Sequence, residues 1–217
     1  MKTVVVAAGT LDVADARWLD VADVVIAADG GATSLDALGR RPDRLIGDLD
    51  SVDAALVERL ARDGTTVERH PVDKEASDTE LAIDAAFDAG ATSVTLIGAA
   101  GGDRLDHELA NMLLLADPRF TSRDLRAVQG STVVRALHGP ARARLDGHPG
   151  DLVTLLPLAG DARGVTTDGL RWPLDGATLR MGRSRGLSNE VVRGGGSVGI
   201  EHGTLLIIEI SKEATAP

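Results

Sequence analysis

The 217-residue sequence predicts an α/β domain followed by a smaller antiparallel β domain. Up to residue 138, short runs rich in Val and Ile alternate with stretches of helical period, which is typical of a mostly parallel sheet covered by helices. After His138-Gly139-Pro140 the helical period disappears, and apolar segments are separated by Gly, Pro and Asp, as in a β-sandwich or barrel. We therefore expect domains at residues 1–138 and 139–217.

The elements follow from local patterns, taken in chain order. The strands expected in the first domain are short apolar runs at 4–8, 24–28, 45–46 and 93–97. One helix is expected from Ser51 to Gly64, a second begins at Ser77, where Ser77 and Glu80 have capping-box spacing, and a third ends before Pro118. The strands expected in the second domain lie at 151–158, 197–200 and 204–210, with a glycine turn at 194–196.

Composition excludes several classes of protein. With 43% apolar residues, the chain resembles a folded domain rather than a disordered or collagen-like one. It contains no Cys, which excludes disulfide scaffolds and thiolate chemistry. The formal net charge of −10 argues against a nucleic-acid partner, and the excess of acids lies entirely within residues 1–138.

The N-terminus lacks the pattern of a secretory or membrane segment. Lys2 precedes an apolar run, but Gly9 and Asp12 interrupt it, so we interpret the run as a buried strand. No stretch reaches the ~18 apolar residues that a membrane helix needs. We therefore expect a cytoplasmic protein with no membrane partner.

Two carboxylates follow the third expected strand. In an extended segment Asp48 and Asp50 point to the same side, and such close like charges favour a hard divalent cation between them. The alternative is a turn followed by a helix cap at Ser51. Spacing alone leaves the two interpretations about equal.

Further acids and one lysine follow neighbouring elements. Asp29 precedes Gly30 and Gly31 at the end of a strand, where glycines permit close backbone approach to a ligand, although Asp-Gly is also a common turn. At a helix start, Lys74 could reach a phosphate oxygen and Asp78 could complete a metal site. The alternative for Asp78 is that a first-turn acid stabilises the helix dipole.

A glycine-rich turn at 98–102 precedes another helix. Its N–H groups could cradle phosphate and Arg104 could add a forked donor, although neither common nucleotide motif is present. Asp106 as a helix cap and His107 as a core or surface residue are the alternative interpretations.

The second domain offers polar and aromatic candidates. Trp172, beside a proline, could be a stacking platform, although core filling is the commoner role. Ser188 and Asn189 could orient a small polar ring, and turn formation explains them equally well.

Together and in this order, these segments resemble the thiamine pyrophosphokinase family over nearly the whole chain. Two departures are an inserted Asp103 and Ser77 where the family usually has Thr. The matching runs are 28–32, 42–51, 73–82, 101–111, 169–174 and 184–190.

The resemblance implies a three-layer α/β catalytic domain, a C-terminal antiparallel β-sandwich and a homodimer with active sites shared between the chains. It implies Mg²⁺-dependent transfer of pyrophosphate from ATP to the thiamine hydroxyl, giving thiamine diphosphate and AMP. The implied metal ligands are Asp29, Asp48, Asp50 and Asp78, with Lys74 and Arg104 stabilising charge. The implied ATP-binding residues are Asp29, Gly30, Gly31, Asp106 and His107, and the implied thiamine-binding residues are Trp172, Ser188 and Asn189.

The same residues are also compatible with three rival functions. One is pyrophosphoryl transfer to another alcohol, such as a hydroxymethyl pterin. The second is a nucleotide or thiamine sensor without catalysis, and the third is a metal-dependent phosphatase that uses Asp48 and Asp50.

Overall fold

The computed structural model describes residues 1–212, which form two compact units. The first comprises Met1–Leu114 and Arg123–Gly130, and the second comprises Leu115–Ser122 with the described residues from Ser131 onward. Strand β7 (Thr132–His138) falls within the range 1–138, but it is paired along its length with β13 (His202–Ile210) and groups with the second unit. The two units are described separately below.

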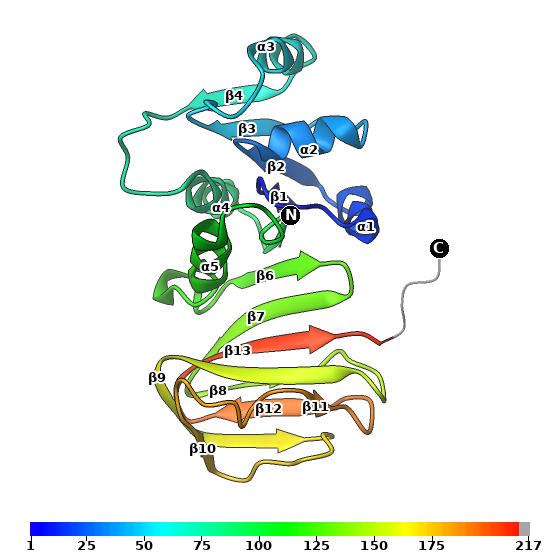
Figure 1. The fold of residues 1–217 in the computed structure, drawn as a ribbon, viewed down its shortest axis with the longest axis vertical. Helices are drawn as coiled ribbons and strands as arrows, with labels where there is room; N and C mark the ends of the chain where they lie inside the picture. The colour runs from blue at the N-terminus through cyan, green and yellow to red at the C-terminus, as the bar shows by residue number, and fades with distance from the viewer. Residues whose placement is uncertain (213–217) are drawn as a thin grey trace. The chain divides into compact units, whose positions relative to one another are not determined.

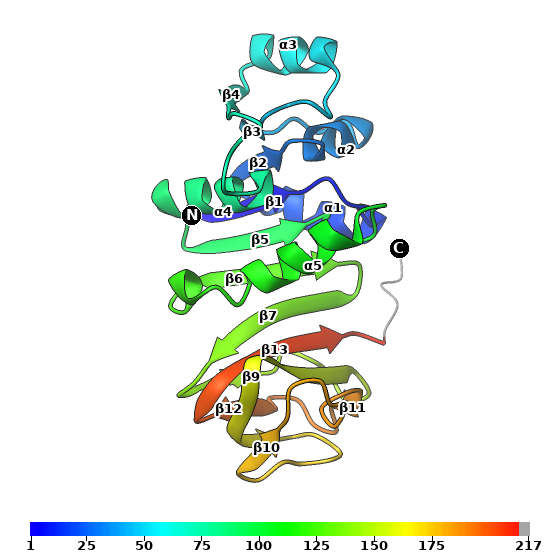
Figure 2. The ribbon, with the colours of Figure 1, turned by 60° about the vertical axis from the view of Figure 1, so that its left-hand side comes forward.

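The first unit contains a parallel sheet in the order β4-β3-β2-β1-β5-β6. In Figures 1 and 2, α4 and α5 lie on one face of this sheet and α1 and α2 on the other, which confirms the predicted three-layer arrangement. The strands are β1 (Lys2–Val6), β2 (Val24–Ala28), β3 (Arg44–Gly47), β4 (Thr66–Arg69), β5 (Ser93–Ile97) and β6 (Asp124–Gln129). The helices are α1 (Ala16–Asp20), α2 (Gly31–Ala37), α3 (Ala54–Arg62), α4 (Asp78–Asp88) and α5 (Leu105–Leu114), with a 3₁₀ turn η1 (Val13–Asp15).

Packing on both faces explains the apolar runs of the central strands. Val5 and Val6 of β1 and Leu96 of β5 are fully buried, as expected for parallel strands covered by helices. Helix α4 turns Ile83 and Phe87 into this core, and burying side chains of this size contributes about 1.5–3 kcal/mol each. The sheet is therefore a rigid base for the loops at its edge.

The order of the strands determines where those loops meet. The chain runs outward from β1 to β4, then returns to place β5 on the other side of β1 and β6 beyond it. The strand order thus reverses between β1 and β5, and ligands of open α/β sheets bind outside the carboxyl ends of the strands at such a point.

Helix starts follow the predicted capping chemistry in one case and differ in another. Ser77 caps α4, because its Oγ accepts a hydrogen bond from the N–H of Glu80 at 3.2 Å. The cap of α3 is Asp53, whose side chain accepts from the N–H of Ala55. Ser51, which sequence reasoning offered as that cap, is thereby left for another partner.

The second unit is an antiparallel β structure, as the sequence predicts. Its strands follow the order β7-β13-β9-β12-β8, with β10 and β11 also paired with β9 (Figure 1). Fully buried residues such as Val153, Leu155 and Leu205 form its core. The remaining elements are η2 (Pro118–Phe120), β8 (Ala141–Arg144), β9 (Leu152–Asp168), β10 (Ala177–Leu179), β11 (Asn189–Glu190) and β12 (Ser197–Ile200). In the part of the chain that the structure describes, no helix is long and apolar enough to cross a membrane.

Candidate active site

A cavity of about 630 Å³ lies at the carboxyl edge of the parallel sheet in the first unit. Its wall consists of the loops that follow β1, β2, β3, β4 and β5 together with the starts of α4 and α5. This is the edge at which the strand order reverses, so the fold places the cavity where open α/β sheets bind ligands.

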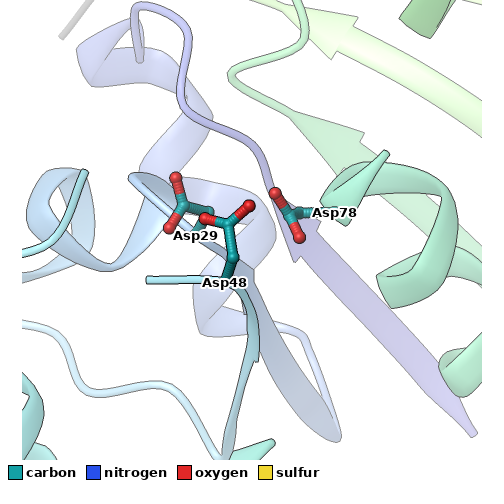
Figure 3. Close-up of side chains that lie close together, drawn as sticks. All are labelled: Asp29, Asp48 and Asp78. Atoms are coloured by element: carbon teal, nitrogen blue, oxygen red, sulfur yellow. The ribbon is translucent and has the colours of Figure 1, made fainter. Parts of the chain in front are cut away.

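Three carboxylates come together in this cavity. Asp29 follows β2, Asp48 follows β3 and Asp78 is the first residue of α4, and one ligand atom from each lies within 4.8 Å of the others. Figure 3 shows the three side chains close together, carried by three different segments of the chain. We call Asp29, Asp48 and Asp78 the acidic trio. Carboxylates so close together repel unless a cation or proton neutralises them.

Lys74 pairs with two members of the acidic trio, Asp48 and Asp78. Its Nζ donates a hydrogen bond to Asp48 Oδ2 at 2.9 Å and lies 3.2 Å from Asp78 Oδ1. The hydrogen bond from Lys74 lowers the pKa of Asp48, so this carboxyl is ionised at neutral pH. Burial lowers the pKa of Lys74, but its two carboxylate partners outweigh burial and raise it, so the lysine is charged.

Asp29 has an unusual backbone conformation, and its carboxylate accepts a hydrogen bond from a hydroxyl group. Its φ of +43° is a left-handed conformation that is uncommon for residues other than glycine. Ser51 Oγ donates a hydrogen bond to Asp29 Oδ2, while Asp29 Oδ1 is buried and has no hydrogen-bond partner. A buried carboxylate oxygen without a partner is costly, so this oxygen fits a site for a cation.

Gly47 allows the trio to approach so closely. A Cβ at this position would lie 3.0 Å from Asp29 Cβ and 3.1 Å from Asp78 Oδ1. Its φ of +154° is also one that residues with a side chain rarely adopt. Glycine is therefore required at the end of β3 for both space and conformation.

Asp50 lies on the cavity wall beside the trio but is not among the three clustered carboxylates. Its N–H donates to Asp48 Oδ1 at 3.3 Å. The negative charge of Asp48 raises the pKa of Asp50, as expected for two carboxylates on one wall of the cavity.

The predicted glycines beside Asp29 have packing roles. A Cβ on Gly31 would lie 2.0 Å from the carbonyl oxygen of Val6, so this glycine lets α2 pack against the end of β1. A Cβ on Gly30 would lie 3.2 Å from Ser51 Oγ, the hydroxyl that contacts Asp29.

The glycine-rich turn after β5 is tied to α5 by side chains. Glu108 Oε1 accepts the N–H of Gly101 at 2.8 Å, and the buried Asn111 donates to the carbonyl of Ala99 at 2.9 Å. The N–H of Gly101, which sequence reasoning offered to phosphate, is thus engaged by a carboxylate. Sequence reasoning did not identify Glu108 or Asn111 as anchors of this turn.

Arg104, on the wall of the cavity, pairs with the exposed Asp106. Arg104 makes two hydrogen bonds to Asp106, at 2.9 and 2.7 Å, and this guanidinium holds the pKa of Asp106 well below its usual range. Arg104 and His107 line the cavity, and both side chains reach solvent.

A second cavity, of about 400 Å³, lies within the second unit and contains the remaining predicted residues. Trp172 is 57% exposed on its wall, and the Arg171 guanidinium lies 5.2 Å from its ring centroid. Asn189 Oδ1 accepts the N–H of Trp172 at 3.1 Å, and Asn189 Nδ2 donates to the Trp172 carbonyl at 2.7 Å. Ser188, with φ +55°, is exposed on the same wall.

Comparison with known proteins follows the same division of the chain. Residues 16–127, more than half of the chain, match the family model described as thiamin pyrophosphokinase, catalytic domain. Residues 142–205 match the model described as thiamin pyrophosphokinase, vitamin B1 binding domain.

Individual relatives and solved structures agree with these models. A thiamine pyrophosphokinase of Bacillus subtilis is 24% identical over 84% of this chain and 85% of its own, and thiamine pyrophosphokinase 3 of Oryza sativa is 27% identical over 81% and 73%. The crystal structure of a thiamin pyrophosphokinase from Geobacillus thermodenitrificans has a TM-score of 0.82 at 27% identity, covering 100% of each chain. The Bacillus subtilis crystal structure has a TM-score of 0.86 at 24% identity and covers 98% of this chain and 100% of its own.

Fold and relatives together define a group-transferring enzyme of the kinase class. More narrowly, the chain belongs to the thiamin pyrophosphokinase family, because the catalytic-domain model spans more than half of it. The family resemblance and the two-part fold predicted from the sequence are therefore confirmed.

Proposed function

We propose that this enzyme transfers the pyrophosphoryl group of ATP to the hydroxyethyl oxygen of thiamine, giving thiamine diphosphate and AMP. The observation that carries the proposal is the acidic trio with Lys74 in a cavity at the reversal point of a parallel sheet. Relatives that cover most of the chain bear the name thiamine pyrophosphokinase, which supports thiamine as the acceptor.

The residues of the trio fit a magnesium ion. Mg²⁺ prefers carboxylate oxygens, and Asp29 offers a buried oxygen that has no other partner. Asp29, Asp48 and Asp78 would hold the ion, and Asp50 on the same wall could add a further oxygen. When bound, Mg²⁺ would neutralise polyphosphate charge, without which these acids would repel ATP.

The basic residues of the cavity would act on the transferring group. Lys74, on the cavity wall beside Asp48, is a compact cation that could stabilise charge on the pyrophosphoryl oxygens. Arg104, also on the cavity wall, could contact the phosphate of the AMP leaving group, once it exchanges Asp106 for that phosphate. Gly30, Gly31, Asp106 and His107 would border the bound nucleotide.

The acceptor pocket in this proposal is the cavity of the second unit. Trp172 would stack on a thiamine ring, and the cationic thiazolium suits its π face. Ser188 would donate or accept a hydrogen bond, and Asn189 holds the backbone of Trp172 in place. We further propose a homodimer in which one copy presents thiamine to the phosphates bound by the other. A cytoplasmic location also stays a prediction.

Product identification separates this function from its rivals. Purified protein is incubated with Mg²⁺, ATP and thiamine, and the products are separated and identified. Equal amounts of AMP and thiamine diphosphate support the proposal. AMP formed only with a hydroxymethyl pterin, release of inorganic phosphate, or binding without turnover would each identify a different function and contradict ours.

Variants test the two halves of the site separately. Asp48→Ala or Asp50→Ala should abolish turnover in a folded protein, and near-normal activity at saturating Mg²⁺ would contradict the role of these acids in metal binding. The double variant Ser188→Ala, Asn189→Ala should lose thiamine affinity but keep ATP affinity. Unchanged thiamine affinity would rule out the second cavity as the acceptor pocket.

A further inference from the structure

Lys74 occupies an unusual place for a residue that is expected to contact phosphate. Its ammonium lies 2.9 Å from Asp48 and 3.2 Å from Asp78, and the lysine side chain is only 14% exposed. It therefore neutralises two members of the acidic trio. A divalent cation bound by the trio would therefore compete with the Lys74 ammonium for the carboxylates of Asp48 and Asp78.

The loop that carries Lys74 is suited to movement of the side chain. Lys74 lies between β4 and α4, where the structure has no helix or strand, and its four-carbon stem has several rotatable bonds. The carboxylates, by contrast, have short side chains beside regular elements: Asp48 comes directly after β3, and Asp78 begins α4 behind the Ser77 cap. When a cation binds to the carboxylates, the long lysine side chain is therefore the partner that can move away.

We propose that Lys74 is an exchangeable counter-ion of the acidic trio. It holds Asp48 and Asp78 together in the absence of a divalent cation, and it leaves them when such a cation binds, which frees its ammonium for the polyphosphate. This inference rests on the proposed function, since it assigns the freed ammonium to the phosphate chain of the donor.

The exchange would make Lys74 a specificity-determining residue. A polyphosphate that arrives without a divalent cation would find Lys74 already paired with two carboxylates, and the trio would repel it. A polyphosphate that arrives with the cation would gain both the ion and the released lysine. The site would thus bind the polyphosphate and its cation together and discriminate against the metal-free polyphosphate.

The reactivity of the Lys74 amine tests the exchange directly. The full-length protein is acetylated with an amine-reactive ester, with and without Mg²⁺ and in the absence of nucleotide, and each lysine is quantified by peptide mass spectrometry. The chain has only three lysines, and the exposed Lys2 and Lys212 are internal controls. We expect Mg²⁺ to raise the acetylation rate of Lys74 roughly tenfold, equivalent to about 1.4 kcal/mol, and to leave the controls unchanged.

A binding measurement provides a second and independent test. The Kd of Mn²⁺ is measured without nucleotide by electron paramagnetic resonance for wild type, Lys74→Met and the matched control Lys212→Met. Removal of the competing ammonium should tighten Mn²⁺ binding roughly tenfold in Lys74→Met, while the control should match wild type. The methionine keeps an unbranched side chain of similar length, so the loop should retain its packing.

The outcomes separate this inference from the proposed function. Unchanged Lys74 acetylation in a protein that binds Mn²⁺ and makes thiamine diphosphate would overturn the exchange alone. A rise in Lys74 acetylation without formation of thiamine diphosphate would support the exchange and overturn the proposed function. Weaker or equal Mn²⁺ affinity in Lys74→Met, or no Mn²⁺ binding to wild type, would also overturn the exchange.

Discussion

Replacing Gly47 by alanine should disturb the acidic site more than the fold. The new Cβ would lie 3.0 Å from Asp29 Cβ and 3.1 Å from Asp78 Oδ1, closer than ordinary van der Waals contact, so these acids must move by a few tenths of an ångström. A misplacement of 1 Å can cost about 100-fold in rate, so we expect a loss of about tenfold in kcat and a weaker affinity for Mn²⁺. Backbone strain at φ +154° should add about 1–3 kcal/mol of lost stability.

Gly39→Ala is the matched control for this prediction. Gly39 also has a positive φ, of +66°, but a Cβ there would have no atom within 4 Å. The Gly39→Ala variant should lose about as much unfolding free energy as Gly47→Ala, and it should keep wild-type turnover and Mn²⁺ affinity. Denaturant unfolding, steady-state kinetics and Mn²⁺ titration measure the three quantities. If both variants lose stability equally and Gly47→Ala keeps wild-type kcat and Mn²⁺ affinity, the close approach of the acids at Gly47 does not matter to the site.

Three further predictions concern positions that hold other groups in place. Ser51→Ala should weaken Mn²⁺ binding by about tenfold, because Asp29 loses the hydroxyl that orients it, and Ser51→Thr should restore the affinity in the same titration. Asn189→Ala should lower thiamine affinity and change the fluorescence of Trp172, because the Trp172 backbone loses both of its amide partners; an unaltered spectrum and Kd would contradict this. Asp151→Asn should cost about 2 kcal/mol of unfolding free energy at neutral pH. Burial raises the pKa of Asp151, but the N–H groups of Lys212 and His148 outweigh burial and lower it, so unfolding curves of the two proteins should converge as the pH falls below about 3.8.

The fold was predictable where one local signal determined an element. The runs 24–28 and 93–97 match β2 and β5, and Ser77 with Glu80 marked the start of α4. Periodicity failed where an element is short or lacks an apolar stripe, as in α2 and β4. In α5 the exposed fractions of Leu109 and Leu113 are 57% and 58%, so an apolar residue in a helix is not always part of the core.

The acids of the site were predictable because each follows a strand or begins a helix. Parallel strands bring their carboxyl ends to one edge, so sequence order alone could place Asp29, Asp48 and Asp78 near one another. Contacts between distant residues could not be predicted. The hydrogen bond from Ser51 to Asp29 spans 22 positions, and the bond from Lys74 to Asp48 spans 26.

The roles of two glycines, Gly47 and Gly31, also could not be predicted from local sequence patterns. Gly47 ends β3, and only the structure reveals that a side chain there would meet two carboxylates. Gly31 stands at the start of α2, and only the structure reveals that the carbonyl of Val6 occupies the space that a side chain there would fill. Such close approaches depend on how elements pack, which sequence spacing does not encode.

The fate of one phosphorus atom tests the central proposal most directly. ATP labelled at the β-phosphorus is incubated with the wild-type enzyme, Mg²⁺ and thiamine, and the label is followed in the separated products. If the pyrophosphoryl group moves as a unit, all transferred label appears in thiamine diphosphate, matched by an equal amount of unlabelled AMP. Label in ADP or in inorganic phosphate would contradict pyrophosphoryl transfer to thiamine.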